Sequence, residues 1–131
     1  MSSMEQLIAK TALLDCGLSD SNALLVMGRS ASFEWYEDGY VGVCTQTESL
    51  MPFGLGRPKT VWLGYLVPEF AEILYPAIRS EVQFRVRIVE VSPSYISESG
   101  QTEIYVSIWG FPDALRRSGL VYASVDLRQA N

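Results

Sequence analysis

The sequence predicts an α+β fold: a mostly antiparallel sheet of about five or six strands, with an N-terminal helix and two short helices. Stretches in which apolar and polar residues alternate, as in half-buried strands, recur along the chain. Pro68 and Pro112 each precede a stretch with helical spacing. The length of 131 residues and the hydrophobic content of 48% suit one core, so we expect a single domain over residues 1–131.

Residues 3–16 form the predicted N-terminal helix. Their apolar side chains recur at spacings that share one broad helix face: Met4, Leu7, Ile8, Ala12 and Leu14. Residues 19–22 offer a second helix cap before the apolar residues 23–27. This second run is too short for its periodicity to separate a helical turn from a buried strand.

Residues 31–45 are predicted to form a β-hairpin. Two runs rich in aromatic and β-branched residues, 33–36 and 40–44, flank the turn residues 37–39. The turn ends in Asp-Gly, which favours a hairpin because glycine accepts a positive φ. Residues 60–66 are expected to form the next strand.

The segment 46–59 is rich in glycine and proline, yet it carries the apolar side chains of Met51, Phe53 and Leu55. Apolar residues are unusual in a loop that only connects two strands. We interpret this loop either as a binding element or as a cover folded over the core or a sheet edge.

A helix is expected over residues 69–79, with Pro68 in its first turn. Because Pro76 lacks a backbone N–H, the regular part is predicted to end near Leu74 or Tyr75. Further along the chain, a short helix is expected over residues 112–119.

Three more strands are predicted, over residues 81–91, 102–109 and 120–127. The alternation of the first slips at Ile88-Val89, which predicts a β-bulge there. The expected inward set of the first two strands is apolar: Val82, Phe84, Val86, Ile88, Ile104, Val106 and Ile108.

The opposite face of these two strands is the candidate partner-binding surface. Arg85 and Arg87 on one strand, and Glu103 and Tyr105 on the other, are expected to be cross-strand neighbours. Exposed pairs of this kind are worth at most about 1 kcal/mol each, so they set register rather than catalyse. The apolar loop residues complete the candidate site: Met51, Phe53 and Leu55.

The net charge is −5 and the isoelectric point is near 4.6. An acidic surface repels phosphate backbones and disfavours general nucleic-acid binding. It suits either ordinary solubility or the approach of a basic partner.

Cys16 and Cys44 match no metal motif and are expected to be buried, reduced thiols. We expect a cytoplasmic protein without a secretory signal or a membrane span.

The sequence holds no histidine, which removes the commonest general base and metal ligand. Residues 54–57 carry part of a Gly-rich phosphate loop but lack its strand and helix context. The carboxylates Glu69 and Glu72 share a helix face that is normally solvated. We therefore expect a protein that is not an enzyme and binds no cofactor or metal, with a carboxylate-based hydrolase as a remote class.

Aromatic residues are numerous for a sheet of this size: Trp35, Tyr36, Tyr40, Trp62, Tyr65, Tyr95, Tyr105 and Trp109. Tryptophan and tyrosine are favoured at interfaces, and they also stack bases when arginines lie between them. The alternative is that the tryptophans pack the core beneath the helices.

Residues 63–74, followed by residues 86–91, resemble the C-terminal half of a HIRAN domain. The shared features are a strand ending in Gly-Tyr-Leu, a short helix that opens on proline, and a hairpin. The resemblance covers residues 61–92 and implies recognition of DNA ends or stalled-fork DNA. The order of the elements alone is similar to that of small acidic secretion chaperones, which implies a dimer that binds a partner polypeptide.

The leading hypothesis is a non-enzymatic protein-binding module that forms homo-oligomers. It would act as an accessory, adaptor or assembly protein of the kind found in phages or viruses. The alternatives are a HIRAN-like module that binds nucleic-acid ends and a chaperone-like dimer.

Overall fold

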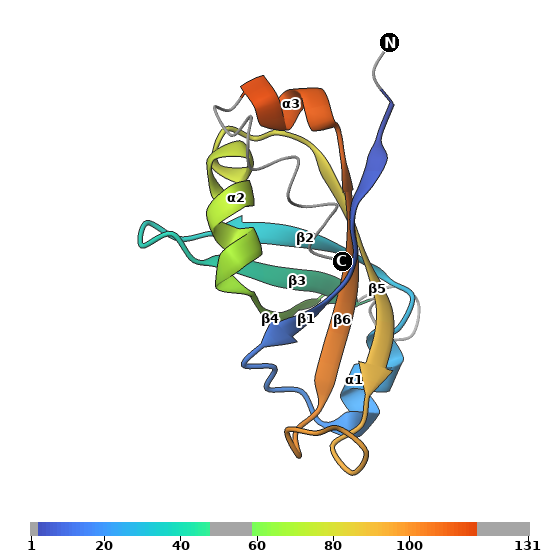
Figure 1. The fold of residues 1–131 in the computed structure, drawn as a ribbon. Coiled ribbons are helices and arrows are strands. Elements are labelled where there is room, and N and C mark those ends of the chain that lie inside the picture. The colour runs from blue at the N-terminus through green and yellow to red at the C-terminus, as the bar shows by residue number, and fades with distance from the viewer. Residues whose placement is uncertain (1–2, 48–58, 118–131) are drawn as a thin grey trace.

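The computed structural model describes residues 3–47 and 59–117. Within these ranges the strands close into a barrel in the order β1-β4-β3-β2-β5-β6, and every neighbouring pair is antiparallel (Figure 1). The strands are β1 (Glu5–Leu14), β2 (Ser30–Trp35), β3 (Val41–Thr47), β4 (Lys59–Leu66), β5 (Phe84–Ser92) and β6 (Glu103–Gly110). The helices are α1 (Asp20–Val26), α2 (Pro68–Arg79) and α3 (Pro112–Arg117). The mostly antiparallel sheet with short helices is thus confirmed.

The predicted N-terminal helix is wrong, because residues 5–14 form strand β1 between β4 and β6. Its register shifts twice against β6, between Gln6 and Ile8 and between Ile8 and Thr11. These bulges bury side chains at positions 7, 8, 11 and 13, a spacing that imitates one face of a helix. Burial in the barrel outweighs the local helix propensity of the segment.

The open question at residues 23–27 is resolved as helix. Ser19 caps α1 by accepting a hydrogen bond from the backbone N–H of Asn22, at 3.3 Å. Ala23 and Val26 are buried on the core side of α1.

The hairpin of β2 and β3 is confirmed. The backbone N–H of Tyr36 donates to the carbonyl of Tyr40, which closes a three-residue turn. Gly39 has φ 91°, the left-handed conformation that the Asp-Gly pair predicted. Figure 1 shows this turn projecting at the left, beyond the rest of the barrel.

The regular part of helix α2 was predicted to end before Pro76. Instead, the helix continues through Pro76 to Arg79. Pro76 removes one backbone hydrogen bond, yet Leu74, Ala77 and Ile78 on both sides of it are buried. Packing of this apolar face on the core holds the last turn in helical form. No helix in the described ranges is long and apolar enough to cross a membrane.

The predicted bulge in β5 is confirmed, because the pairing with β6 shifts between Ile88 and Glu90. The inward side chains of β5 and β6 lie in the core: Val86, Ile88, Ile104, Val106 and Ile108. Val82 and Phe84, expected in the same set, are only half-buried. The predicted strand 120–127 lies outside the described residues.

Candidate functional site

The four residues of the predicted partner surface do not pair across the strands. Arg85 lies opposite Trp109 and Arg87 opposite Ser107, whereas Tyr105 lies opposite Glu90. The bulge between Ile88 and Glu90 shifts the pairing of β5 with β6, so the residues before it and after it are in different registers. The outer face of β5 and β6 is therefore divided into an arginine half and a Tyr105 half.

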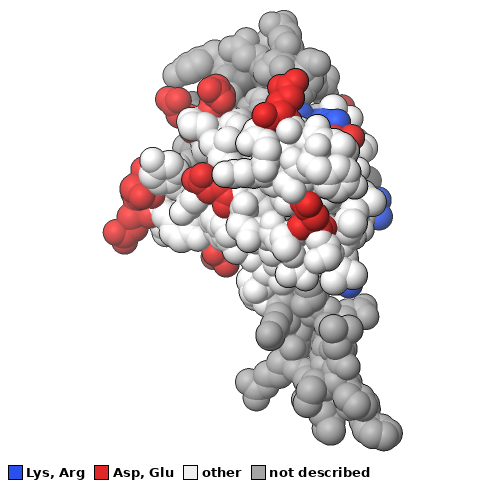
Figure 2. Space-filling view, turned by 90° about the horizontal axis from the view of Figure 1, so that it is seen from below, with Lys and Arg blue, Asp and Glu red and all other residues white. Residues whose placement is uncertain are grey.

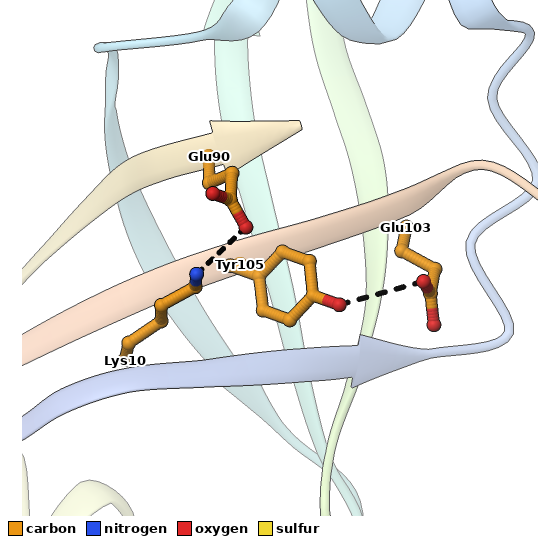
Figure 3. Close-up of polar contacts among 4 residues, drawn as sticks. All are labelled: Lys10, Glu90, Glu103 and Tyr105. Carbon is orange, nitrogen blue, oxygen red and sulfur yellow. Dashed lines mark hydrogen bonds and ion pairs between the residues drawn. The ribbon is translucent and has the colours of Figure 1, made fainter. Parts of the chain in front are cut away.

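The Tyr105 half is engaged in contacts within the chain (Figure 3). Lys10 Nζ on β1 lies 2.7 Å from Glu90 Oε2 and 4.7 Å from the centre of the Tyr105 ring. The Tyr105 hydroxyl donates to Glu103 Oε1 at 3.4 Å. Burial and the charge of Glu103 raise the pKa of Tyr105 above its ordinary value. These side chains link β1, β5 and β6, and each already has a polar or cation–π partner within the chain.

The arginine half contains a hollow of about 290 Å³. We call it the arginine hollow, and it is lined by Gln6, Ala9, Arg85, Arg87, Val89, Ser107 and Trp109. The small side chains of Ala9 and Ser107 leave space beside the Trp109 ring. Arg87 Nε donates to the carbonyl of Gly28 at 3.4 Å. Among residues 3–47 and 59–117, no carboxylate forms an ion pair with Arg85 or Arg87.

Aromatic rings gather on a second outer face, formed by β3, β4 and the end of β2. Trp62 and Tyr65 are in edge contact at 4.8 Å, and Tyr65 lies 5.6 Å from Tyr40 and 6.4 Å from Tyr36. None of the three tryptophans belongs to the buried core: Trp35 is 41% exposed, and Trp62 and Trp109 are half-buried. The interpretation that they pack the core is therefore wrong, although Trp35 does contact Tyr75 of α2.

An acidic and aromatic groove of about 350 Å³ runs between the β2–β3 turn and α2. The turn contributes Asp38, Gly39 and Tyr40. Helix α2 contributes residues at spacings of three and four, which form one helix face: Pro68, Ala71, Glu72, Tyr75 and Pro76. We call this feature the acidic groove.

Contacts between the hairpin and α2 fix the shape of the acidic groove. The Tyr75 hydroxyl donates to the backbone carbonyl of Tyr36 at 2.7 Å. Trp35 meets Tyr75 edge to face, with ring centres 6.2 Å apart. The Arg79 guanidinium lies 5.5 Å from the centre of the Trp35 ring. Beside the groove, the chain thus already makes a cation–π contact of its own, between Arg79 and Trp35.

The charge around the acidic groove is negative. Asp38 and Glu72 line it, and the exposed Glu34 and Glu37 lie on the same hairpin. Figure 2 shows acidic side chains at the left margin, the side from which the hairpin projects in Figure 1, and basic side chains along the right margin. The field at the groove therefore attracts cations and repels phosphates.

Neither cysteine has the surroundings of a nucleophile. Burial, followed by the charge of Glu34, raises the pKa of the Cys44 thiol to about 11. Burial also raises the pKa of Cys16. Residues 3–47 and 59–117 contain no group of three or more side chains suited to hold a metal ion.

Sequence reasoning found part of these surfaces and missed the rest. It named Arg85 and Arg87, but it missed Gln6 and Ala9 because residues 3–16 were expected to form a helix. It identified the Asp-Gly turn but not the side of α2 that faces this turn. The spacing of three and four between the groove residues of α2 could have indicated that side. The predicted loop residues lie outside the described ranges: Met51, Phe53 and Leu55.

Comparison with known proteins gives no relative for this chain. No family model, no curated protein and no solved structure matches it. A functional proposal therefore depends on the geometry and charge of the surfaces described above.

Proposed function

We propose that this protein is a non-enzymatic, cytoplasmic binding module that captures a basic segment of a partner polypeptide in the acidic groove. It would serve as an accessory, adaptor or assembly protein. The observation that supports this proposal best is the pairing of exposed carboxylates with tyrosine rings in one groove, between the β2–β3 turn and α2.

The groove offers an arginine or lysine side chain two kinds of contact. Asp38 and Glu72 supply negative charge, and Tyr40 and Tyr75 supply aromatic rings. An exposed ion pair contributes about 0.2–1 kcal/mol and an exposed cation–π contact about 0.5–1 kcal/mol. One basic residue thus gains about 1–2 kcal/mol, far below the roughly 8 kcal/mol of a micromolar complex. A partner segment must therefore place several residues along the groove and its neighbouring rings.

Nucleic acid suits the acidic groove poorly. Its phosphates would approach Asp38 and Glu72, and no described cation lines the groove to neutralise them. The net charge of −5 acts in the same direction at longer range. Both the groove carboxylates and the net charge favour a basic polypeptide.

A fluorescence-anisotropy titration tests the proposal with three labelled probes: a short peptide in which Arg and Lys alternate with Ser, the same peptide with Glu in place of the basic residues, and a short single-stranded DNA. We expect the basic peptide to bind in low salt and to weaken as salt rises. The acidic peptide and the DNA should not bind in the groove. Equal binding of the basic and acidic peptides would contradict the proposal.

Variants of the groove locate the binding. Glu72→Lys should weaken the basic peptide about tenfold, because it inverts one charge in the groove. Tyr75→Phe keeps the ring but removes the hydroxyl that ties α2 to the hairpin, so it should weaken the peptide by loosening the groove. Glu98→Lys makes the same change of charge in the β5–β6 loop, away from the groove, and is the matched control. If Glu98→Lys weakened binding as much as Glu72→Lys, general electrostatic attraction would replace the groove as the explanation.

A further inference from the structure

The arginine hollow presents two guanidinium groups beside an aromatic wall. Arg85 and Arg87 are exposed, and no carboxylate of the described residues forms an ion pair with either. Paired guanidiniums favour carboxylate or phosphate partners, because each can bind two oxygens with parallel hydrogen bonds. Arg87 uses its Nε on the Gly28 carbonyl, which leaves its two terminal nitrogens for such a partner. This surface therefore suits an acidic occupant.

The tip of the β2–β3 hairpin has the complementary charge and shape. Glu37 and Asp38 are adjacent and exposed at the turn, and Tyr40, which follows them, is 54% exposed. Figure 1 shows the turn projecting from the barrel, so it is a convex feature that a hollow can receive.

The two features lie apart on the same barrel. Strand β2 pairs with β5 through its first residues, with Ser30 opposite Arg87, whereas the hairpin tip follows the last residue of β2, Trp35. The arginine hollow is centred on β6, and the hairpin tip belongs to β2 and β3. One copy cannot bring its own tip to its own hollow, whereas a neighbouring copy can.

We propose that the Glu37–Asp38 hairpin tip of one copy docks in the arginine hollow of a second copy. Each contact uses one tip and one hollow, and each copy carries both. Two copies can therefore dock reciprocally in a two-fold dimer, and further copies can extend the assembly into a chain or a ring. The contact does not depend on the basic segment proposed above, because Arg85 and Arg87 do not line the acidic groove. It does share Asp38 with the groove, so a basic peptide should compete with assembly.

Size-exclusion chromatography with light scattering tests the proposal on the purified full chain over a range of concentrations. In low salt the mass should rise with concentration above the 14.6 kDa of one copy, and it should return to that value in high salt. A mass that stays at one copy at every concentration in low salt would overturn the proposal.

Variants with reversed charge at the tip or at the hollow test directly whether these two features contact each other. The variant Glu37→Lys with Asp38→Lys has a basic tip and a basic hollow, so it should be monomeric alone. The variant Arg85→Glu with Arg87→Glu has an acidic tip and an acidic hollow, so it too should be monomeric alone. Mixed together, each tip meets a hollow of opposite charge, and the mixture should assemble.

Recovery in the mixture would also show that both variants fold. A wild type that assembles while the mixture stays monomeric would place the contact on another surface. Assembly of either variant alone would do the same. A monomeric wild type that binds short single-stranded DNA through Arg85 and Arg87 would assign the hollow to nucleic acid instead.

Discussion

Gly42 shows how one residue without a side chain positions the aromatic face. The Trp62 ring lies over Gly42, and a Cβ built there would stand 2.6 Å from Trp62 Cη2 and 3.3 Å from Tyr36 Cε2. The alternation of β3 identifies the face on which Gly42 lies, but it does not identify the ring that covers it. That contact requires the pairing of β3 with β4, whose register shifts between Val43 and Cys44.

Gly42→Ala is expected to lower the free energy of unfolding by about 1–3 kcal/mol, because Trp62 must move away from the strand. Denaturant unfolding measures the loss, and tryptophan fluorescence in the folded state reports the movement of the ring. Gly17→Ala is the matched control: no atom lies within 4 Å of its added Cβ, and it should change stability by less than about 0.5 kcal/mol. Equal effects of the two substitutions would mean that Trp62 does not rest on Gly42.

At the scale of elements, Asp20 joins α1 to the loop between β5 and β6. Its carboxylate accepts hydrogen bonds from the backbone N–H of Ser94 at 2.8 Å and the Ser94 hydroxyl at 2.7 Å, and from the Thr102 hydroxyl. These hydrogen bonds, first that of Thr102 and then those of Ser94, lower the pKa of Asp20 below its ordinary value. The contact is long-range, so the sequence predicted a cap within residues 19–22 but not this link.

The lowered pKa makes the contribution of Asp20 depend on pH. Because the folded-state value lies below the ordinary 3.8, the stabilisation is present above pH 3.8 and is lost as the pH falls through the folded-state value. The difference in unfolding free energy between the wild type and Asp20→Asn should therefore be constant near neutral pH and shrink in acid. Thermal unfolding from neutral to strongly acidic pH measures it.

Removal of the donors provides the control for Asp20. Ser94→Ala combined with Thr102→Val deletes both hydroxyl donors and should reduce the difference that Asp20→Asn makes at neutral pH. A difference between wild type and Asp20→Asn that is the same at neutral and acid pH would show that the carboxylate charge is not stabilised in the fold.

Strand β1 shows the limit of periodicity for a whole element. Leu7, Ile8 and Thr11 are buried at spacings of one and three because two bulges interrupt the alternation. Regular strands such as β5 and β6 were predicted from alternation, together with the bulge after Ile88. A strand with repeated bulges has no such period, and its conformation is decided by the neighbours that it pairs with.

At the scale of the whole molecule, barrel closure creates surfaces that no local pattern contains. Alternation identifies which side chains point inward, but β1 pairs with both β4 and β6, which are distant in sequence. The acidic groove exists because α2 returns beside the β2–β3 turn, and the arginine hollow because β1 completes the outer face of β5 and β6. The net charge was predictable, whereas its separation into an acidic tip and a basic hollow depends on the fold.

The most direct test of the central proposal is to map the bound basic peptide by NMR on the isotope-labelled protein. Chemical-shift changes in the backbone amides of residues 36–40 and 69–77, without comparable changes in β1, β5 and β6, are the result that the acidic groove predicts. The titration should be run in low salt, at a protein concentration at which light scattering gives the mass of one copy, so that shifts report the peptide alone. Changes confined to the outer face of β1, β5 and β6, or no changes at peptide concentrations that saturate the anisotropy signal, would contradict the groove as the binding site.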